Sequence, residues 1–91
     1  MIRKQKHAGV VTVTFILPAN IPCAPISVVG NFNDWQPHRH PMIRRQDGTL
    51  STTVLAASGS TLHFRYLGTD GWWFDDNDAD YVDRDGSYVV A

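Results

Sequence analysis

The segment from Val10 to Leu17 restricts the possible folds of this chain more than any other. It reads V-V-T-V-T-F-I-L, and Val11, Val13 and Phe15 fall at alternate positions. Alternation in a run of β-branched residues predicts a β-strand with one face toward a core. No window of useful length shows the apolar spacing of a helix. The chain is therefore expected to be all-β.

Turn-forming residues divide the rest of the sequence into further short strands. Prolines at positions 18, 22 and 25 prevent regular structure after the first strand, and Asp47-Gly48 predicts a tight hairpin. The expected strands cover residues 9–17, 26–30, 42–45, 49–57, 61–67, 72–75 and 88–90. About six to eight short strands separated by turns indicate an antiparallel β-sandwich, with a small barrel as the alternative.

The length of the chain suits one domain. Ninety-one residues allow one modest core. Residues 1–8 carry three Lys and Arg side chains and are expected to form a solvated basic arm ahead of a single domain at residues 9–91. Cys23 is the only cysteine, so no internal disulfide can form. No apolar stretch typical of a signal peptide or membrane span is visible, and a cytoplasmic protein is the expectation.

Acidic residues are concentrated late in the sequence. The formal net charge is −1, but seven of the nine acidic residues lie between Asp70 and Asp85. Carboxylates in this region would repel a phosphate backbone. We therefore expect no nucleic-acid partner, and no membrane partner either.

The first candidate binding motif spans Val28 to Trp35 and reads V-V-G-N-F-N-D-W. Its polar residues are those that end a strand and build a tight turn. Phe32 is expected to pack under this turn as its apolar anchor. Because Phe32 fills that role, Trp35 is expected to remain exposed at the exit of the turn.

A second aromatic group follows the turn signal Asp70-Gly71 and comprises Trp72, Trp73 and Phe74. Neighbouring residues on a strand point to opposite faces, so one of the two tryptophans should face outward. Arg65 lies on the preceding strand and is expected to point outward, with Asp70 or Asp75 as a candidate ion partner. Aromatic faces suit the C–H faces of sugar rings, and a guanidinium suits their hydroxyls.

With these motifs placed, the chain resembles the isoamylase N-terminal-like early-set domains, which are the family-48 carbohydrate-binding modules. The resemblance rests on V-V-G-N-F-N-D-W, on H-F-R-Y at residues 63–66 and on D-G-W-W-F-D-D at residues 70–76. The family includes the glycogen-binding domain of the AMP-activated protein kinase β-subunit. The resemblance implies an immunoglobulin-like antiparallel β-sandwich that binds α-1,4-linked glucan without catalysis.

The resemblance also implies roles for individual residues. Trp35 and Trp73 correspond to the two tryptophans that stack on sugar rings. Arg65 corresponds to a basic residue, often lysine, that contacts sugar hydroxyls. Trp72 and the turn residue Asn33 complete the candidate carbohydrate-binding set.

The chain departs from the family after residue 76. The stretch A-D-Y-V-D-R-D-G-S-Y-V-V-A is short and acidic, and Ser87 falls near the place of an asparagine that contacts glucan in the glycogen-binding members. This difference supports an alternative function, in which the same fold has lost sugar binding. The module would then bind a partner protein such as a glycogen-metabolising enzyme.

No cofactor, metal or catalytic site is expected. Asp76, Asp78 and Asp80 have the spacing of calcium-loop ligands, but Tyr81 occupies the position where an EF-hand requires glycine. A solvated acidic loop is the preferred interpretation. The histidine pair at positions 38 and 40 lacks a third ligand. Paired aspartates in one loop of a small sandwich offer no deep cleft for glycoside hydrolysis.

Overall fold

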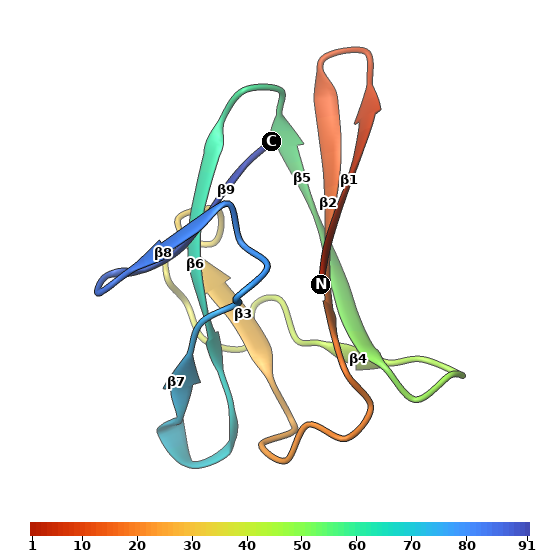
Figure 1. Cartoon of the computed structure of the whole chain (residues 1–91), viewed down its shortest axis with the longest axis vertical. Coiled ribbons are helices and arrows are strands. Elements are labelled where there is room, and N and C mark those ends of the chain that lie inside the picture. The colour runs from red at the N-terminus through yellow and green to blue at the C-terminus, as the bar shows by residue number, and fades with distance from the viewer.

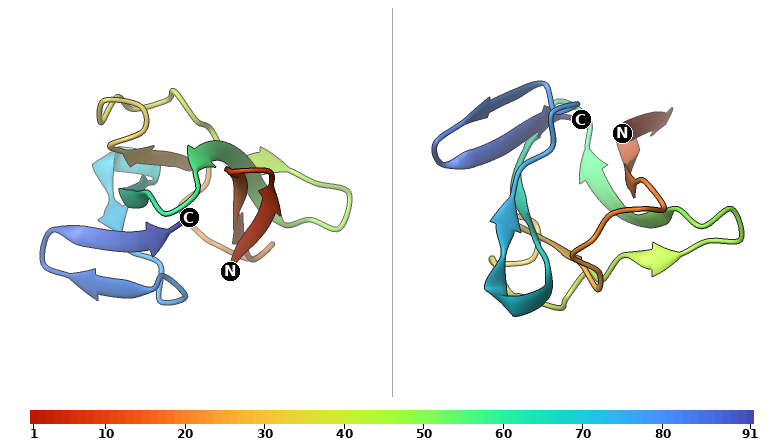
Figure 2. Two further views of the ribbon diagram at one scale, coloured as in Figure 1. Left: turned by 90° about the horizontal axis from the view of Figure 1, so that it is seen from above. Right: turned by 60° about the horizontal axis from the view of Figure 1, so that its bottom comes forward.

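Two antiparallel β-sheets face each other across an apolar core (Figures 1 and 2). The structure is a computed structural model that describes residues 1–91. The strands are β1 (Ile2–His7), β2 (Val10–Leu17), β3 (Ser27–Gly30), β4 (Ile43–Arg44), β5 (Leu50–Ala57), β6 (Thr61–Leu67), β7 (Trp73–Phe74), β8 (Tyr81–Asp83) and β9 (Gly86–Val90). A 3-10 turn at Thr69–Gly71 is the one helical element, and no helix is long or apolar enough to cross a membrane. The predicted all-β sandwich is thereby confirmed, and the barrel alternative is wrong.

The first sheet has the strand order β1-β2-β5-β4 and the second has the order β3-β6-β9-β8. Strand β7 pairs with the end of β6, so β6 has β3 along one side and both β9 and β7 along the other. The free edge of β3 is covered, because Val28 N–H donates to the His40 carbonyl at 3.0 Å and Met42 N–H donates to the Ile26 carbonyl at 2.8 Å. This pairing holds the loop that follows Trp35 against the second sheet.

The core lies between the two sheets and contains three fully buried aromatic rings. Phe15 on β2 meets Phe64 and Tyr66 on β6 edge-to-face, with ring centroids 4.7 and 6.4 Å apart. Phe32 packs against the same cluster, and its ring centroid lies 6.2 Å from that of Phe15. The prediction that Phe32 anchors its turn is confirmed.

The N-terminal residues form a strand and not a free arm. All of residues 2–7 pair with β2, from Ile2 opposite Phe15 to His7 opposite Val10. Their side chains are exposed apart from Ile2, which is half-buried, so only the expected solvation of the charges is correct. The segment lacks apolar alternation because it is an edge strand. Its backbone groups form hydrogen bonds with β2 while its charged side chains stay in water.

Strand β8 was also missed, and the strands number nine where six to eight were expected. All three side chains of β8 are exposed, so the segment has no apolar face for sequence analysis to detect. Its pairing with β9 through the Arg84-Asp85 turn determines its conformation.

Candidate functional site

The outer face of the second sheet brings most of the predicted binding residues together. Side chains alternate along β6, and His63, Arg65 and Leu67 point away from the core and are partly exposed. Trp73 is paired opposite Leu67, so its side chain lies on this same outer face, where it is 39 % exposed. The predicted outward orientation of Arg65 and Trp73 is confirmed.

Trp35 reaches the same face from the turn after β3. Its N–H donates to the Gly30 carbonyl at 2.9 Å, and both Asp34 and Trp35 have a left-handed backbone, with φ of 56° and 57°. This turn directs the indole over β6, where its ring centroid lies 4.8 Å from that of His63 in an edge-to-face contact. The side chain is 39 % exposed, which confirms the prediction that Trp35 lies outside the core.

The two tryptophans mark the ends of a short track along β6. His63, beside Trp35, and Leu67, beside Trp73, are four residues apart on one strand. At about 3.3 Å per residue these two positions are roughly 13 Å apart. Arg65 projects between them. The two indoles therefore flank opposite ends of β6, Trp35 from the side of β3 and Trp73 from the side of β7.

The Arg65 guanidinium is held by an aspartate on this face. Arg65 Nε lies 3.3 Å from Asp75 Oδ1, and both side chains are partly exposed, which confirms Asp75 as its partner. Gly86 leaves room for the arginine stem, because a Cβ at this position would lie 2.9 Å from Arg65 Cγ. The ion pair limits the positions that the guanidinium can adopt.

A stack of three rings extends this face across β9 to β8. Tyr88 lies between His63 and Tyr81, with both pairs of centroids 4.3 Å apart and ring planes within 10° and 12°. His63 Nε2 lies 2.8 Å from the Asp85 carbonyl oxygen and donates to it. The stacked rings cover one another's faces and present their edges to solvent. The sequence pattern assigns no role to His63 or to the two tyrosines, because their contacts depend on the pairing of β9 with β6 and with β8.

Trp72 does not share this face. Its ring packs against Phe74 at a centroid distance of 6.2 Å, and Phe74 is opposite the core residue Tyr66. Trp72 therefore lies on the other side of β7 from Trp73, although it precedes the strand and stays 56 % exposed. The structure therefore does not bring Trp72 together with Trp73 on one face, and a sugar-binding role for Trp72 stays a prediction.

Asn33 is a structural residue of the turn and is not available to a ligand. It is 3 % exposed. Its Oδ1 accepts from Gly30 N–H at 3.0 Å, and its Nδ2 donates to the Val28 carbonyl at 3.0 Å and to His40 Nδ1 at 2.9 Å. The predicted binding role of Asn33 is therefore wrong, because the turn itself uses its donors and acceptors.

The contact between Asn33 and His40 predicts a pH dependence of stability. Asn33 Nδ2 can only donate, so His40 Nδ1 must be unprotonated, and burial with the nearby Arg39 charge lowers the pKa of His40 below its ordinary 6.5. The folded state then binds fewer protons than the unfolded state below about pH 6.5. Stability should fall as the pH drops below this value and level off below the folded-state pKa.

The test compares urea midpoints at about pH 7.5 and about pH 5.5 for the wild type and for His40→Gln, which accepts a hydrogen bond but does not titrate in this range. We expect a smaller pH dependence in His40→Gln. The exposed neighbour His38, changed to Gln, provides the control and should behave as the wild type does. Equal slopes in all three proteins would contradict the prediction.

The acidic segment is partly structural. Asp76 is 6 % exposed, and it accepts hydrogen bonds from the Tyr66 hydroxyl at 2.6 Å and from Asp78 N–H at 2.8 Å. Ser87 is fully buried, where its Oγ accepts from Asp76 N–H at 3.0 Å and donates to Asp75 Oδ1 at 3.1 Å. The interpretation of this run as a wholly solvated loop is corrected for Asp76, and Ser87 does not reach the outer face. No group of three metal-ligating side chains is present.

The track along β6 continues into a groove at its Leu67 end. This groove has a volume of about 490 Å³ and lies between the start of β3, the loop after Trp35 and the 3-10 turn. Its lining includes Ser27, Pro37, His38, Leu67 and Asp70. The lining mixes apolar residues, three of them prolines, with polar ones, so the groove offers contacts both to the C–H faces and to the hydroxyls of a sugar.

The fold and this face define a small all-β domain with an exposed aromatic surface. No protein-family model and no curated protein sequence matches the chain.

Proposed function

We propose that this domain is a cytoplasmic, non-catalytic module that binds α-1,4-linked glucan on the outer face of its second sheet. The observation that carries the proposal is the line of Trp35, Arg65 and Trp73 along β6. These are the three residues to which the resemblance assigns sugar contacts. The immunoglobulin-like topology of the family is part of the same proposal.

The chemistry of the face suits a sugar chain. Exposed indole rings can cover the C–H faces of pyranose units, while the guanidinium of Arg65 donates to hydroxyls between them. Asp75 orients Arg65 and supplies an acceptor on the same face. The face is open, so it buries little of a ligand, and we expect weak binding that increases with glucan length.

The neighbouring tryptophans on β7 allow a matched test. Trp73→Ala should weaken maltoheptaose binding at least tenfold, about 1.4 kcal/mol, because it removes one of the two aromatic platforms. Trp72→Ala removes an indole of equal size from the opposite side of the strand, so it should leave the affinity unchanged. Trp35→Ala should lower the affinity for maltoheptaose by as much as Trp73→Ala does. Binding is measured from the NMR shifts of the indole N–H signals during titration with maltoheptaose.

The outcomes separate the possible sites. Equal losses in Trp72→Ala and Trp73→Ala would contradict the assigned face. The absence of any indole shift at millimolar sugar in the folded wild type would contradict glucan binding itself.

The alternative function is a protein-interaction module that has lost sugar binding. Two observations favour it: Asp75 already engages Arg65, and Ser87, near the expected glucan-contacting position, is buried. Two results together would support this alternative. The wild type would show no indole shift in the sugar titration. It would also form a stoichiometric complex with a glycogen-metabolising enzyme, and Trp35→Ala would weaken that complex.

A further inference from the structure

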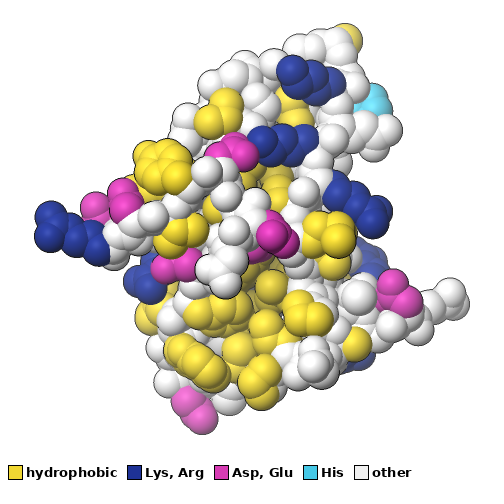
Figure 3. All heavy atoms as spheres, in the orientation of Figure 1, with side chains coloured by type: hydrophobic (Ala, Val, Ile, Leu, Met, Phe, Trp, Pro, Cys, Tyr) yellow, Lys and Arg dark blue, Asp and Glu magenta, His cyan; other side chains and the backbone are white.

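The charges of this protein are segregated between its two sheets. The first sheet and its turns, residues 1–19 and 42–60, contain five of the eight basic residues and one of the nine acidic residues. The rest of the chain contains three basic and eight acidic residues, so the two parts have formal charges of +4 and −5. In Figure 3 the Lys and Arg side chains gather mainly on the side of β1, whereas Asp side chains lie toward β8 and the segment before it.

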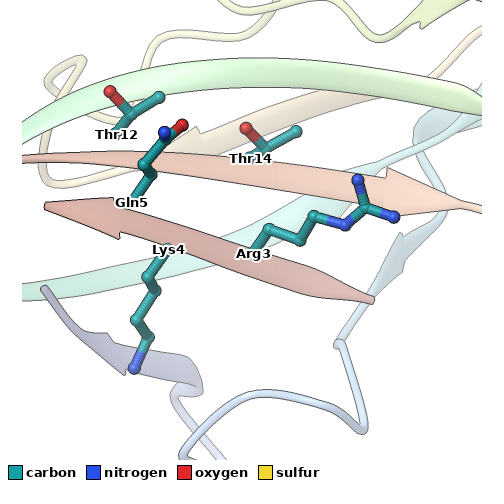
Figure 4. A pocket seen from close by; sticks show the side chains of 5 residues that line it. All are labelled: Arg3, Lys4, Gln5, Thr12 and Thr14. Carbon is teal, nitrogen blue, oxygen red and sulfur yellow. The ribbon is translucent and has the colours of Figure 1, made fainter.

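The outer face of the first sheet carries no carboxylate. The strand registers place on it Arg3, Val10, Ile43 and Leu55 among threonines and other uncharged residues, and none of its side chains is acidic. Arg45 extends over the same face, because its Nε donates to Ser51 Oγ at 2.6 Å. Lys4 points to the other side of β1, where its Nζ pairs with Asp80 Oδ2 at 3.0 Å (Figure 4). The uncompensated cations of this face are therefore Arg3 and Arg45.

Apolar side chains lie exposed among these polar groups. Leu55, Ile43 and Val10 are 71, 52 and 42 % exposed, which is unusual for Leu55 on a central strand. Beside them a hollow of about 420 Å³ is lined by Arg3, Lys4, Gln5, Thr12 and Thr14 (Figure 4). The face thus combines a shallow polar hollow, exposed apolar groups and positive charge.

We propose that this face docks a partner protein whose surface presents carboxylates around an apolar centre. The positive charge and the lack of any acid on the face select an acidic partner, because opposite potentials steer and orient association. The apolar groups select a protein over a nucleic acid, since a phosphate backbone would leave Leu55 and Ile43 without contacts. Eight residues of β5 and four strand widths give a face of roughly 26 by 19 Å, which suits a small, transient interface.

This surface lies on the opposite sheet from the proposed glucan site. A partner could therefore be held while Trp35 and Trp73 remain free, so the two surfaces can be tested independently.

The first experiment maps binding on the full chain by NMR of backbone amides. The probes are poly-L-glutamate and a random copolymer of L-glutamate and L-tyrosine, at low and at physiological salt. Shifts should be confined to the first sheet, on β1, β2, β5 and β4 and at Arg45 next to β4. The copolymer should bind more tightly than poly-L-glutamate, and both affinities should fall with salt because exposed charges are screened.

Two variants on this face, and one control variant on the other sheet, test which residues contribute to binding. Arg3→Glu should lower the affinity for both probes by about three- to tenfold, since it replaces a favourable charge contact with an unfavourable one. Leu55→Ser should remove the preference for the copolymer. Arg84→Glu makes the same charge change on the β8–β9 turn of the other sheet, so it should have little effect. None of these three residues belongs to the glucan site.

Three results would overturn the proposal. Shifts centred on the second sheet would place acid binding elsewhere. Duplex DNA that binds more tightly than the copolymer would assign the face to nucleic acid. Concentration-dependent self-association that Arg3→Glu abolishes would make a second copy of this chain the occupant.

Discussion

Replacing Phe15 with alanine is expected to lower the free energy of unfolding by about 3–5 kcal/mol. The ring is fully buried and contacts Phe64, Tyr66 and Phe32, so its removal leaves a cavity between the sheets. A domain of 91 residues has a total stability of roughly 5–14 kcal/mol. The substitution should therefore remove a large part of it.

Urea unfolding followed by far-UV circular dichroism measures this loss. Leu55→Ala provides a control from the other face of the same sheet, where the side chain is 71 % exposed. It should change the stability by about 0.5 kcal/mol or less. Similar losses in the two variants would contradict the assignment of Phe15 to the centre of the core. Because Phe15 contacts Phe32, the cavity should also loosen the turn that carries Trp35.

The second large effect is expected at the buried pair of Tyr66 and Asp76. Tyr66→Phe should lower the free energy of unfolding by about 1.5–3 kcal/mol, the range for hydrogen bonds to charged groups. The Tyr66 hydroxyl donates to Asp76 Oδ2 at 2.6 Å, and this carboxylate has almost no access to water that would replace the bond. Tyr81→Phe removes a hydroxyl from an exposed side chain and serves as the control, with a change near zero.

The same pair predicts a dependence on alkaline pH. Burial, followed by the negative charge of Asp76, raises the pKa of Tyr66 well above its ordinary value of 10.0. The folded state therefore keeps the proton while the unfolded state loses it above about pH 10, so stability should fall as the pH rises past that value. Tyr66→Phe should show a shallower fall than the wild type. An unchanged slope would show that Tyr66 is not protected from ionisation.

A double-mutant cycle separates the bond from the burial of its partners. Tyr66→Phe combined with Asp76→Ala should cost less than the sum of the two single changes, because each single change leaves the other side chain buried without its hydrogen-bond partner. Strict additivity would contradict a direct interaction between the two side chains.

Much of the architecture follows from local patterns in the sequence. The alternation in β2 predicts both its conformation and its buried face, because a strand needs only neighbouring residues to define its two sides. The turn after Gly30 is predicted for the same reason, with Phe32 inside and Trp35 outside. Alternation along β6 likewise predicts that Arg65 points away from the core.

Other features depend on contacts between residues far apart in the sequence. Strands β1 and β8 have few buried side chains, so their pairing partners determine them and no apolar pattern reveals them. The stack of His63 on Tyr88 requires the register between β6 and β9, which lie in different parts of the sequence. Sequence alone specified which residue types were present on each strand, but not which strands became neighbours.

The candidate site shows the same division. The sequence by itself determined that Trp35 would leave the core and that one of Trp72 and Trp73 would face outward, because the turn chemistry and the strand alternation are local; the resemblance implied that this one is Trp73. Only the tertiary structure decided three other features. Asn33 makes its hydrogen bonds within its own turn, Trp72 lies on the opposite side of β7 from Trp73, and Ser87 is buried. The reason is physical: burial and hydrogen-bond satisfaction depend on what packs against a residue, and those neighbours come from distant strands.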